Sequence, residues 1–294
     1  MKTYWRIILL IAIFVTSCSP LRHLDDLQRS ADASYLEGDH AAALTAYEEL
    51  IASCREADIP VDGQVSRRAG LLAFEAEETA KAIEYLEMAR LSDALDAEAT
   101  RALAISYREV DNLSREIRML EHYVATYPGG DHFTEMQQRL FETLVESLNF
   151  QQAYELWPEL EGEPRKDEGL SSRYLQVLIS LDQQAEATAL AEDLLAMNRN
   201  NVPALDFLAK RHFRQADQLY RREMQAYEAN RTHRQYARLL EALEVVNTDL
   251  RIALDYFTRL YRQNPNSEYA SYLANIYERF QDEENARYYR RRAE

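Results

Sequence analysis

Glycine and proline are scarce in this chain, with seven of each among 294 residues. Both residues favour turns and interrupt regular elements, so their scarcity argues against a β-rich fold built on many tight turns. Positive charge is also in deficit, and the formal net charge of −16 argues against nucleic-acid binding as a default function. These absences together favour an all-α protein that does not bind nucleic acid.

The patterns that most enzymes need are missing as well. None of the six histidines has another histidine four residues away, and no HExxH motif occurs, so no metal site is predicted. The chain has no glycine-rich loop that could cradle a phosphate and no GxSxG motif. We therefore expect a protein that is not an enzyme and that uses no cofactor.

The first 18 residues differ from the rest of the chain. Lys2 and Arg6 precede an apolar stretch over residues 7–15. At about 1.5 Å per residue this stretch is too short to span roughly 30 Å of hydrocarbon, and it is typical of a secretory signal.

The segment Val15-Thr16-Ser17-Cys18 resembles the lipobox of exported bacterial lipoproteins. That resemblance implies a signal peptide over 1–17, lipid attachment at Cys18 and a short tether over 18–22. An ordinary secretory signal with an incidental cysteine is the alternative. Ser19 is not the aspartate that retains some lipoproteins at the inner membrane, so the resemblance favours the outer membrane and leaves the face open.

If Cys18 is acylated, Cys54 is the only remaining thiol and no intramolecular disulfide can form. We expect Cys54 to be a small apolar side chain that fills space in the core. The alternative is a redox role.

A small residue recurs along the chain at a spacing close to 34 residues or its double. The series is interrupted once, where Glu116 replaces a small residue, and a degenerate copy is expected near Tyr220; its members are Ala43, Ala82, Glu116, Ala153, Ala187, Ala253 and Ala286. A repeat of this length is typical of paired helices that stack in sequence order.

The pattern resembles the tetratricopeptide repeat (TPR), whose unit is a helix, a turn and a second helix. One copy matches at positions 7, 20, 24 and 32 through Leu240, Ala253, Phe257 and Pro265; the next matches through Leu273, Ala274, Tyr277 and Ala286. The resemblance implies a right-handed α-solenoid of about eight helix pairs over residues 23–294.

Two departures from regularity are expected. Residues 204–229 contain no glycine, proline or asparagine, so the degenerate sixth copy is predicted to be one long helix near 203–229, with a kink near Gln215 as the alternative. The polar run 161–169 is the candidate for a flexible joint.

In TPR proteins certain first-helix positions line a concave groove. Counting in this register places six arginines along it: Arg67, Arg68, Arg101, Arg139, Arg173 and Arg238. Because guanidinium groups suit carboxylates, the groove is predicted to take an acidic segment of a protein client. The alternative is that the arginines pair with neighbouring Glu98, Glu135 or Glu142.

The expected function is therefore a scaffold or adaptor in the cell envelope, anchored to the membrane by its N-terminal lipid. A glycan- or substrate-capturing lipoprotein of the SusD-like type is the alternative, since that group also contains TPR units. Those chains carry large loop insertions that this chain lacks.

Overall fold

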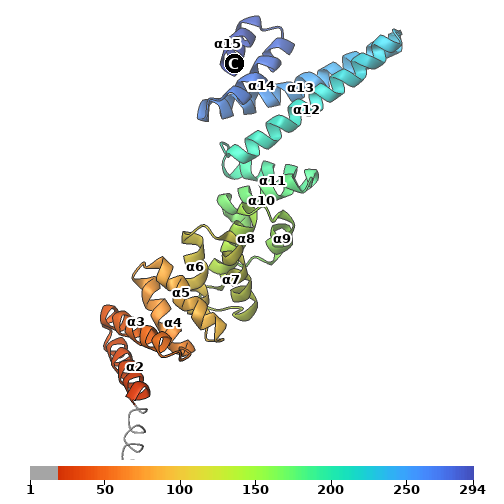
Figure 1. Cartoon of the computed structure of the whole chain (residues 1–294). Helices are drawn as coiled ribbons and strands as arrows, with labels where there is room; N and C mark the ends of the chain where they lie inside the picture. The colour runs from red at the N-terminus through yellow and green to blue at the C-terminus, as the bar shows by residue number, and fades with distance from the viewer. Residues whose placement is uncertain (1–18) are drawn as a thin grey trace, which may run out of the picture. The chain divides into compact units, whose positions relative to one another are not determined.

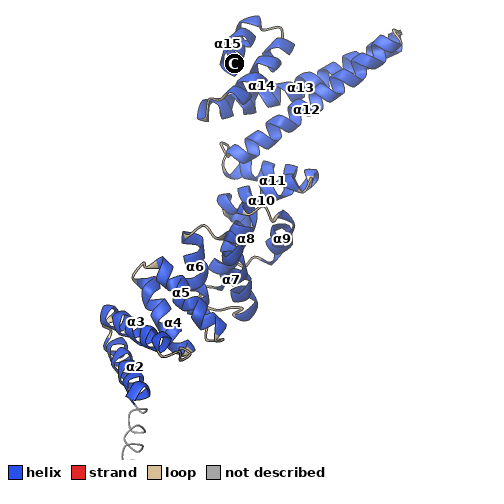
Figure 2. Ribbon diagram, viewed as in Figure 1, coloured by secondary structure: helices blue, strands red, loops and turns tan. Residues whose placement is uncertain are grey.

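The computed structural model describes residues 19–294, and every regular element in that part of the chain is helical (Figure 2). Fourteen α-helices follow one another there, with two short 3-10 helices among them. The signal peptide predicted over 1–17 and the lipid site at Cys18 lie outside the described residues. The chain divides into two compact units between Ser147 and Leu148, and each unit is described by itself.

Unit 1 is a row of antiparallel helix pairs in which each helix packs on the next (Figure 1). Its helices are α2 (Ser19–Glu37), α3 (His40–Glu56), α4 (Gly63–Glu75), α5 (Thr79–Leu91), α6 (Ala97–Glu109), α7 (Leu113–Thr126) and α8 (Phe133–Glu146). The first helices of the second and third pairs, α4 and α6, also touch each other. This order of contacts is that of a repeat solenoid, as the sequence predicted.

Short polar side chains begin several of these helices. The carboxylate of Asp39 accepts a hydrogen bond from the Ala42 amide at 3.0 Å, and Asn112 accepts one from the Arg115 amide at 3.3 Å. Such caps satisfy first-turn N–H groups that have no partner inside the helix. With these caps, the second helix of each pair begins after a turn of only two or three residues.

The recurring small residues lie where the two helices of a pair cross. All seven members of the series are buried, including Glu116, and six of them stand in the second helix of a packed pair, on α3, α5, α7, α11, α13 and α15. Gly70 on α4 shows how close the crossing is, because a Cβ atom there would lie 2.6 Å from Cγ of Leu86 on α5. The spacing of these small residues in the sequence therefore follows from the places where the helices cross.

Cys54 lies on α3 in the core of unit 1, packed with the first two helix pairs. Burial raises the pKa of its thiol above the usual value, which keeps the thiol protonated and unreactive. The prediction of a small apolar filler is confirmed.

Unit 2 combines short helices with one long hairpin. Its helices are α9 (Phe150–Leu156), α10 (Glu168–Ser180), α11 (Gln184–Met197), α12 (Val202–Ala229), α13 (His233–Gln263), α14 (Ser267–Arg279) and α15 (Glu283–Ala293). As in unit 1, successive helices pack on each other, and α10 also touches α12. The last pair begins α15 with the predicted cap, since Asp282 accepts from the Asn285 amide at 3.1 Å.

The long helix expected near 203–229 is present as α12, which runs unbroken for 28 residues. The second long helix of the hairpin, α13, was not predicted from the sequence. α13 is continuous for 31 residues, so Leu240 and Ala253 stand on one helix and the copy assigned to them is not a helix pair. No helix-breaking residue separates the two, which lets the helix continue. The hairpin α12/α13 thus takes the length of two repeats, as Figure 1 shows.

The segment between α9 and α10 holds two 3-10 helices, Trp157–Glu159 and Pro164–Lys166. The flexible joint expected at 161–169 falls partly on the second of them and stays a prediction. Within the described residues, no helix is both long and apolar enough to cross a bilayer.

Candidate functional site

The six predicted groove arginines are divided between the two units. Arg67 and Arg68 lie on α4, Arg101 on α6 and Arg139 on α8, all in unit 1 and all on first helices of pairs. The other two, Arg173 on α10 and Arg238 on α13, are exposed in unit 2. Arg238 does not belong to a separate first helix, because α13 is continuous, so its assignment to the groove wall was wrong in register.

Arg67 and Arg68 bind carboxylates of neighbouring pairs. Arg67 forms an ion pair with Asp96, which also caps α6. Arg68 contacts the Asp32 carboxylate at 2.6 Å, and the Tyr47 hydroxyl donates to the same Asp32 oxygen at 2.6 Å. Both guanidinium groups therefore connect successive pairs instead of facing an open groove.

The hydroxyl of Tyr47 lies in an enclosed contact between the first two helix pairs. Burial, with the hydrogen bond to Asp32, raises the pKa of Tyr47 to about 12. The phenol stays neutral at physiological pH and acts as a donor to the carboxylate. This cluster holds the first two helix pairs together.

Arg139 binds Glu116, the residue that stands in the position usually taken by a small one. The Nε atom of Arg139 donates to Oε1 of Glu116 at 2.9 Å, and Arg108 lies 3.8 Å from the other oxygen. The Glu116 side chain has an exposed fraction of 0%, and burial raises the pKa of its carboxyl although both arginines oppose that effect. The two arginines offset part of the free-energy cost of burying this carboxylate.

Of the four predicted groove arginines in unit 1, Arg101 alone forms no close contact with a carboxylate of residues 19–294. Its nearest carboxylate oxygen, on Glu135, is 3.9 Å from Nη2, too far for a hydrogen bond. Its Nε is buried with no hydrogen-bond partner among the described residues, although 26% of the side chain is exposed. The guanidinium therefore has donors left for a ligand.

A hollow of about 580 Å³ opens beside Arg101. It lies between α6, α7 and the turn before α8, and its lining is Ala97, Glu98, Arg101, Tyr123, Tyr127, Pro128, Gly129, Gly130, Asp131 and His132. The rings of Tyr123 and Tyr127 stand 5.3 Å apart. The hollow offers aromatic surface, one cation with free donors, and two carboxylates at its rim.

The pairing alternative is correct for three of the arginines, but with other acids than those expected. Arg67, Arg68 and Arg139 pair with Asp96, Asp32 and Glu116; of the acids named beforehand, Glu135 lies 3.9 Å from Arg101. Binding of a client by the six arginines stays a prediction, and the geometry favours Arg101 within it.

Sequence reasoning missed the hollow itself. Tyr127, Pro128, Gly129 and Gly130 read as a turn between repeats, which they are. The signal that could have identified a site was the length of this turn together with Tyr123 one helical turn earlier. Gly129 has φ of +72° with no atom within 4 Å of an added Cβ, so the turn is open to solvent at its tip.

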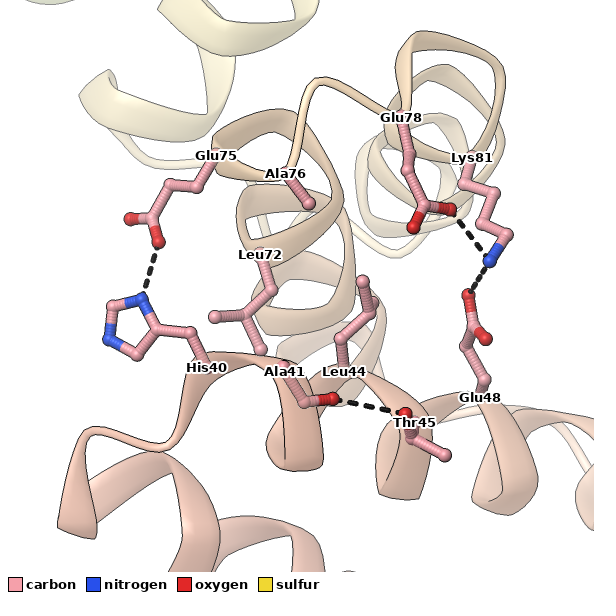
Figure 3. A pocket seen from close by; sticks show the side chains of 10 residues that line it. All are labelled: His40, Ala41, Leu44, Thr45, Glu48, Leu72, Glu75, Ala76, Glu78 and Lys81. Atoms are coloured by element: carbon pink, nitrogen blue, oxygen red, sulfur yellow. Dashed lines mark hydrogen bonds and ion pairs between the residues drawn. The ribbon is translucent and has the colours of Figure 1, made fainter.

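A second hollow, of about 470 Å³, lies between α3, α4 and α5 (Figure 3). His40 Nδ1 is 2.7 Å from Glu75, and Lys81 Nζ lies 2.7 Å from both Glu48 and Glu78. Figure 3 shows these pairs on either side of Leu44 and Leu72. Each charged group that lines this hollow already has a partner, so it is a weaker ligand site than the one beside Arg101.

No protein-family model matches the chain, and no curated protein matches it significantly in sequence. Solved structures do match. A Bacteroides ovatus protein provisionally described as protein-binding is 16% identical with a TM-score of 0.51, over 64% of this chain and 99% of that one. This likeness shows a shared fold.

Two further structures match less well. A TPR repeat-containing protein from Cytophaga hutchinsonii is 13% identical with a TM-score of 0.49, over 90% of this chain and 93% of that one. MamA MSR-1 is 16% identical with a TM-score of 0.38, over 79% and 94%. The all-α repeat architecture itself is established by the helix pairs described above.

Proposed function

We propose that this protein is a lipid-anchored scaffold of the bacterial envelope and that it binds an acidic segment of a protein partner in the hollow beside Arg101. The observation that carries the proposal is the state of Arg101. Its guanidinium lines an open hollow, its Nε is buried without a partner, and its nearest carboxylate is 3.9 Å away. The exposed part of this guanidinium can donate to a ligand carboxylate.

The lining sets what the hollow can take. A carboxylate would accept from the guanidinium fork, and an adjoining side chain would pack on Tyr127. Glu98 and Asp131 on the rim would repel further negative charge, so a single acid beside an apolar or aromatic residue fits better than a run of acids. Stacked helix pairs present such sites along an extended surface, as scaffold proteins require.

The anchor part of the proposal depends on the sequence at Cys18. A thiol placed after a short apolar signal is the acceptor that dual acylation needs, and dual acylation gives stable membrane attachment. The tether to α2 would then be very short, so the first helix pairs would lie close to the bilayer.

Cross-linking mass spectrometry of intact cells tests the binding site. Arg101→Glu should remove at least nine-tenths of the cross-links between α6 and the partner. Arg118→Glu provides the control, because it makes the same charge change at an exposed position on α7 and should leave those cross-links unchanged. Equal recovery of the partner with both variants would refute the site.

The anchor has its own test. The wild-type chain should partition into detergent and carry the mass of attached lipid on its N-terminal peptide. Cys18→Ser should abolish both properties. A wild-type chain that is cleaved but carries no lipid would refute the anchor and leave the Arg101 site untouched.

A further inference from the structure

The outer half of the long hairpin has almost no core. We define the arm as residues 219–240, which are the end of α12, the turn and the start of α13. Leu239 is the only buried residue in it. Tyr236 and Leu240 stand one helical turn apart with exposed fractions of 49% and 46%. Neighbouring large apolar side chains that remain exposed mark an interaction surface.

The arm is also basic in an acidic protein. It carries five arginines against two glutamates. Arg221 and Arg222 pair with Asp217 and Glu223, whereas Arg231, Arg234 and Arg238 are exposed and make no ion pair recorded for residues 19–294. Arg234 and Arg238 are one helical turn apart on one face of α13, whereas Tyr236 and Leu240 lie on the opposite face of that helix. The arm thus carries unpaired guanidinium groups on one face of α13 and exposed apolar side chains on the other.

Unit 1 carries the complementary charge. Residues 19–147 hold 26 acidic and 12 basic side chains. Part of this excess lies at the turns inside three successive helix pairs, where seven exposed acids stand: Glu37, Asp39, Glu75, Glu77, Glu78, Glu109 and Asp111. Because the pairs stack in order, these turns recur along one edge, which we call the acidic edge. Figure 3 shows its middle part, around Glu75 and Glu78.

The acidic edge carries exposed apolar residues too. Leu36 is 84% exposed at the first turn and Val110 is 50% exposed at the third. Between them lies the hollow of about 470 Å³ whose floor includes Leu44 and Leu72. The exposed acids of this edge match the unpaired arginines of the arm in charge.

We propose that the arm of one copy docks on the acidic edge of unit 1 of a second copy. Arg231, Arg234 and Arg238 bind the turn carboxylates. The two surfaces differ, so the contact is heterologous and extends from copy to copy unless it closes into a ring. Both halves of this interface are present in the chain, whereas an anionic membrane would account for the arm alone.

Sedimentation velocity on the full chain in a nonionic detergent tests the proposal. In 50 mM NaCl the protein should form species larger than one copy between about 5 and 100 µM. In 500 mM NaCl the association constant should fall at least tenfold, because salt screens exposed charges. A chain that shows one copy per particle throughout this range at low salt overturns the proposal.

Two sets of variants locate the contact. Arg231→Glu with Arg234→Glu and Arg238→Glu should weaken association at least tenfold. Arg290→Glu with Arg291→Glu and Arg292→Glu makes the same charge change on exposed residues of α15 and should change it less than twofold. Equal loss in both sets would mean a general charge effect and would overturn the arm as the contact.

A charge exchange provides the sharpest test. Glu37→Arg with Glu77→Arg and Asp111→Arg should abolish association alone and restore it when mixed with the arm variant. Failure to restore it would contradict the acidic edge as the receiving surface. If the arm variant instead loses only binding to vesicles of 70% phosphatidylcholine and 30% phosphatidylglycerol, with self-association unchanged, the occupant is a membrane and the proposal is wrong. Arg101 takes no part in this contact, so the result is independent of the client site.

Discussion

The helix pairs of unit 1 and the hairpin of unit 2 both bury apolar side chains between helices, but their helices have different numbers of neighbouring helices. In unit 1 each inner helix lies against helices before and after it, and Tyr47, Leu86, Leu103 and Tyr107 are almost fully buried. In the hairpin, α12 and α13 have such neighbours only near their base. Between Ala216 and Val246 only Leu239 is buried. In this protein, therefore, the longer helices do not have more of their side chains buried.

The two regions also differ in charge. Unit 1 has a formal charge of −14 over residues 19–147, whereas unit 2 holds 24 acidic and 20 basic side chains and has a charge of −4. Repulsion between like charges opposes compaction, and unit 1 reduces it with ion pairs between successive helix pairs, such as Arg67 with Asp96 and Arg68 with Asp32. The arm leaves Arg231, Arg234 and Arg238 without an ion pair among residues 19–294, which is what a surface for an acidic partner requires.

The largest effect is expected at the base of the hairpin. Phe257 on α13 is fully buried and stacks on Tyr272 of α14, with ring centroids 4.4 Å apart. Phe257→Ala should lower the free energy of unfolding by about 3–5 kcal/mol because it leaves a cavity. Leu240→Ala in the arm should change it by less than about 0.5 kcal/mol. Urea denaturation measures both, and similar losses would show that the arm is packed as well as the base.

A smaller effect is expected where helices of unit 1 cross. Gly70→Leu would place side-chain atoms where Leu86 now lies, since even a Cβ would approach Leu86 Cγ to 2.6 Å. Overpacking of this kind should cost about 1–3 kcal/mol. Gly38→Leu is not a suitable control, because Gly38 has φ of +78°; Ala76→Leu at an exposed helix end is. The comparison is read from thermal unfolding, and a neutral Gly70→Leu would contradict the close crossing.

The smallest effect concerns pH. Burial raises the pKa of Glu116 in the folded chain above its unfolded value, so its contribution to stability is full at low pH and is lost as pH rises through the folded pKa. Each unit of difference between the folded and unfolded pKa corresponds to about 1.4 kcal/mol.

Glu116→Gln removes the titrating group but keeps the side-chain shape. The stability of the wild type relative to Glu116→Gln should therefore decrease between pH 4 and pH 7 in urea denaturation. An increase over that range would mean that Arg108 and Arg139 outweigh burial and hold the pKa below its usual value.

The repeat could be predicted because its signal is local. A small residue is required wherever two helices cross, and Ala43, Ala82, Ala187 and Ala253 mark those crossings at spacings close to 34 residues or its multiples. The absence of breaking residues over 204–229 likewise predicted α12. These features depend on short-range sterics that the sequence carries directly.

The candidate site could be predicted only in part. Register placed Arg67, Arg68, Arg101 and Arg139 on first helices, but which arginines are neutralised depends on acids about 23 to 36 residues away. Glu116 looked like a mismatch in the repeat and proved to be the partner of Arg139. The continuity of α13 was missed because matches at single positions, such as Leu240, were weighed above the absence of glycine and proline between 240 and 253.

Native-state hydrogen exchange tests the central contrast most directly. If neighbouring helices are what stabilise each helix here, amides of residues 219–240 will exchange at least a hundredfold faster than those of α4, α6 and residues 250–260. Uniform protection along α12 and α13, equal to that of unit 1, would contradict the account.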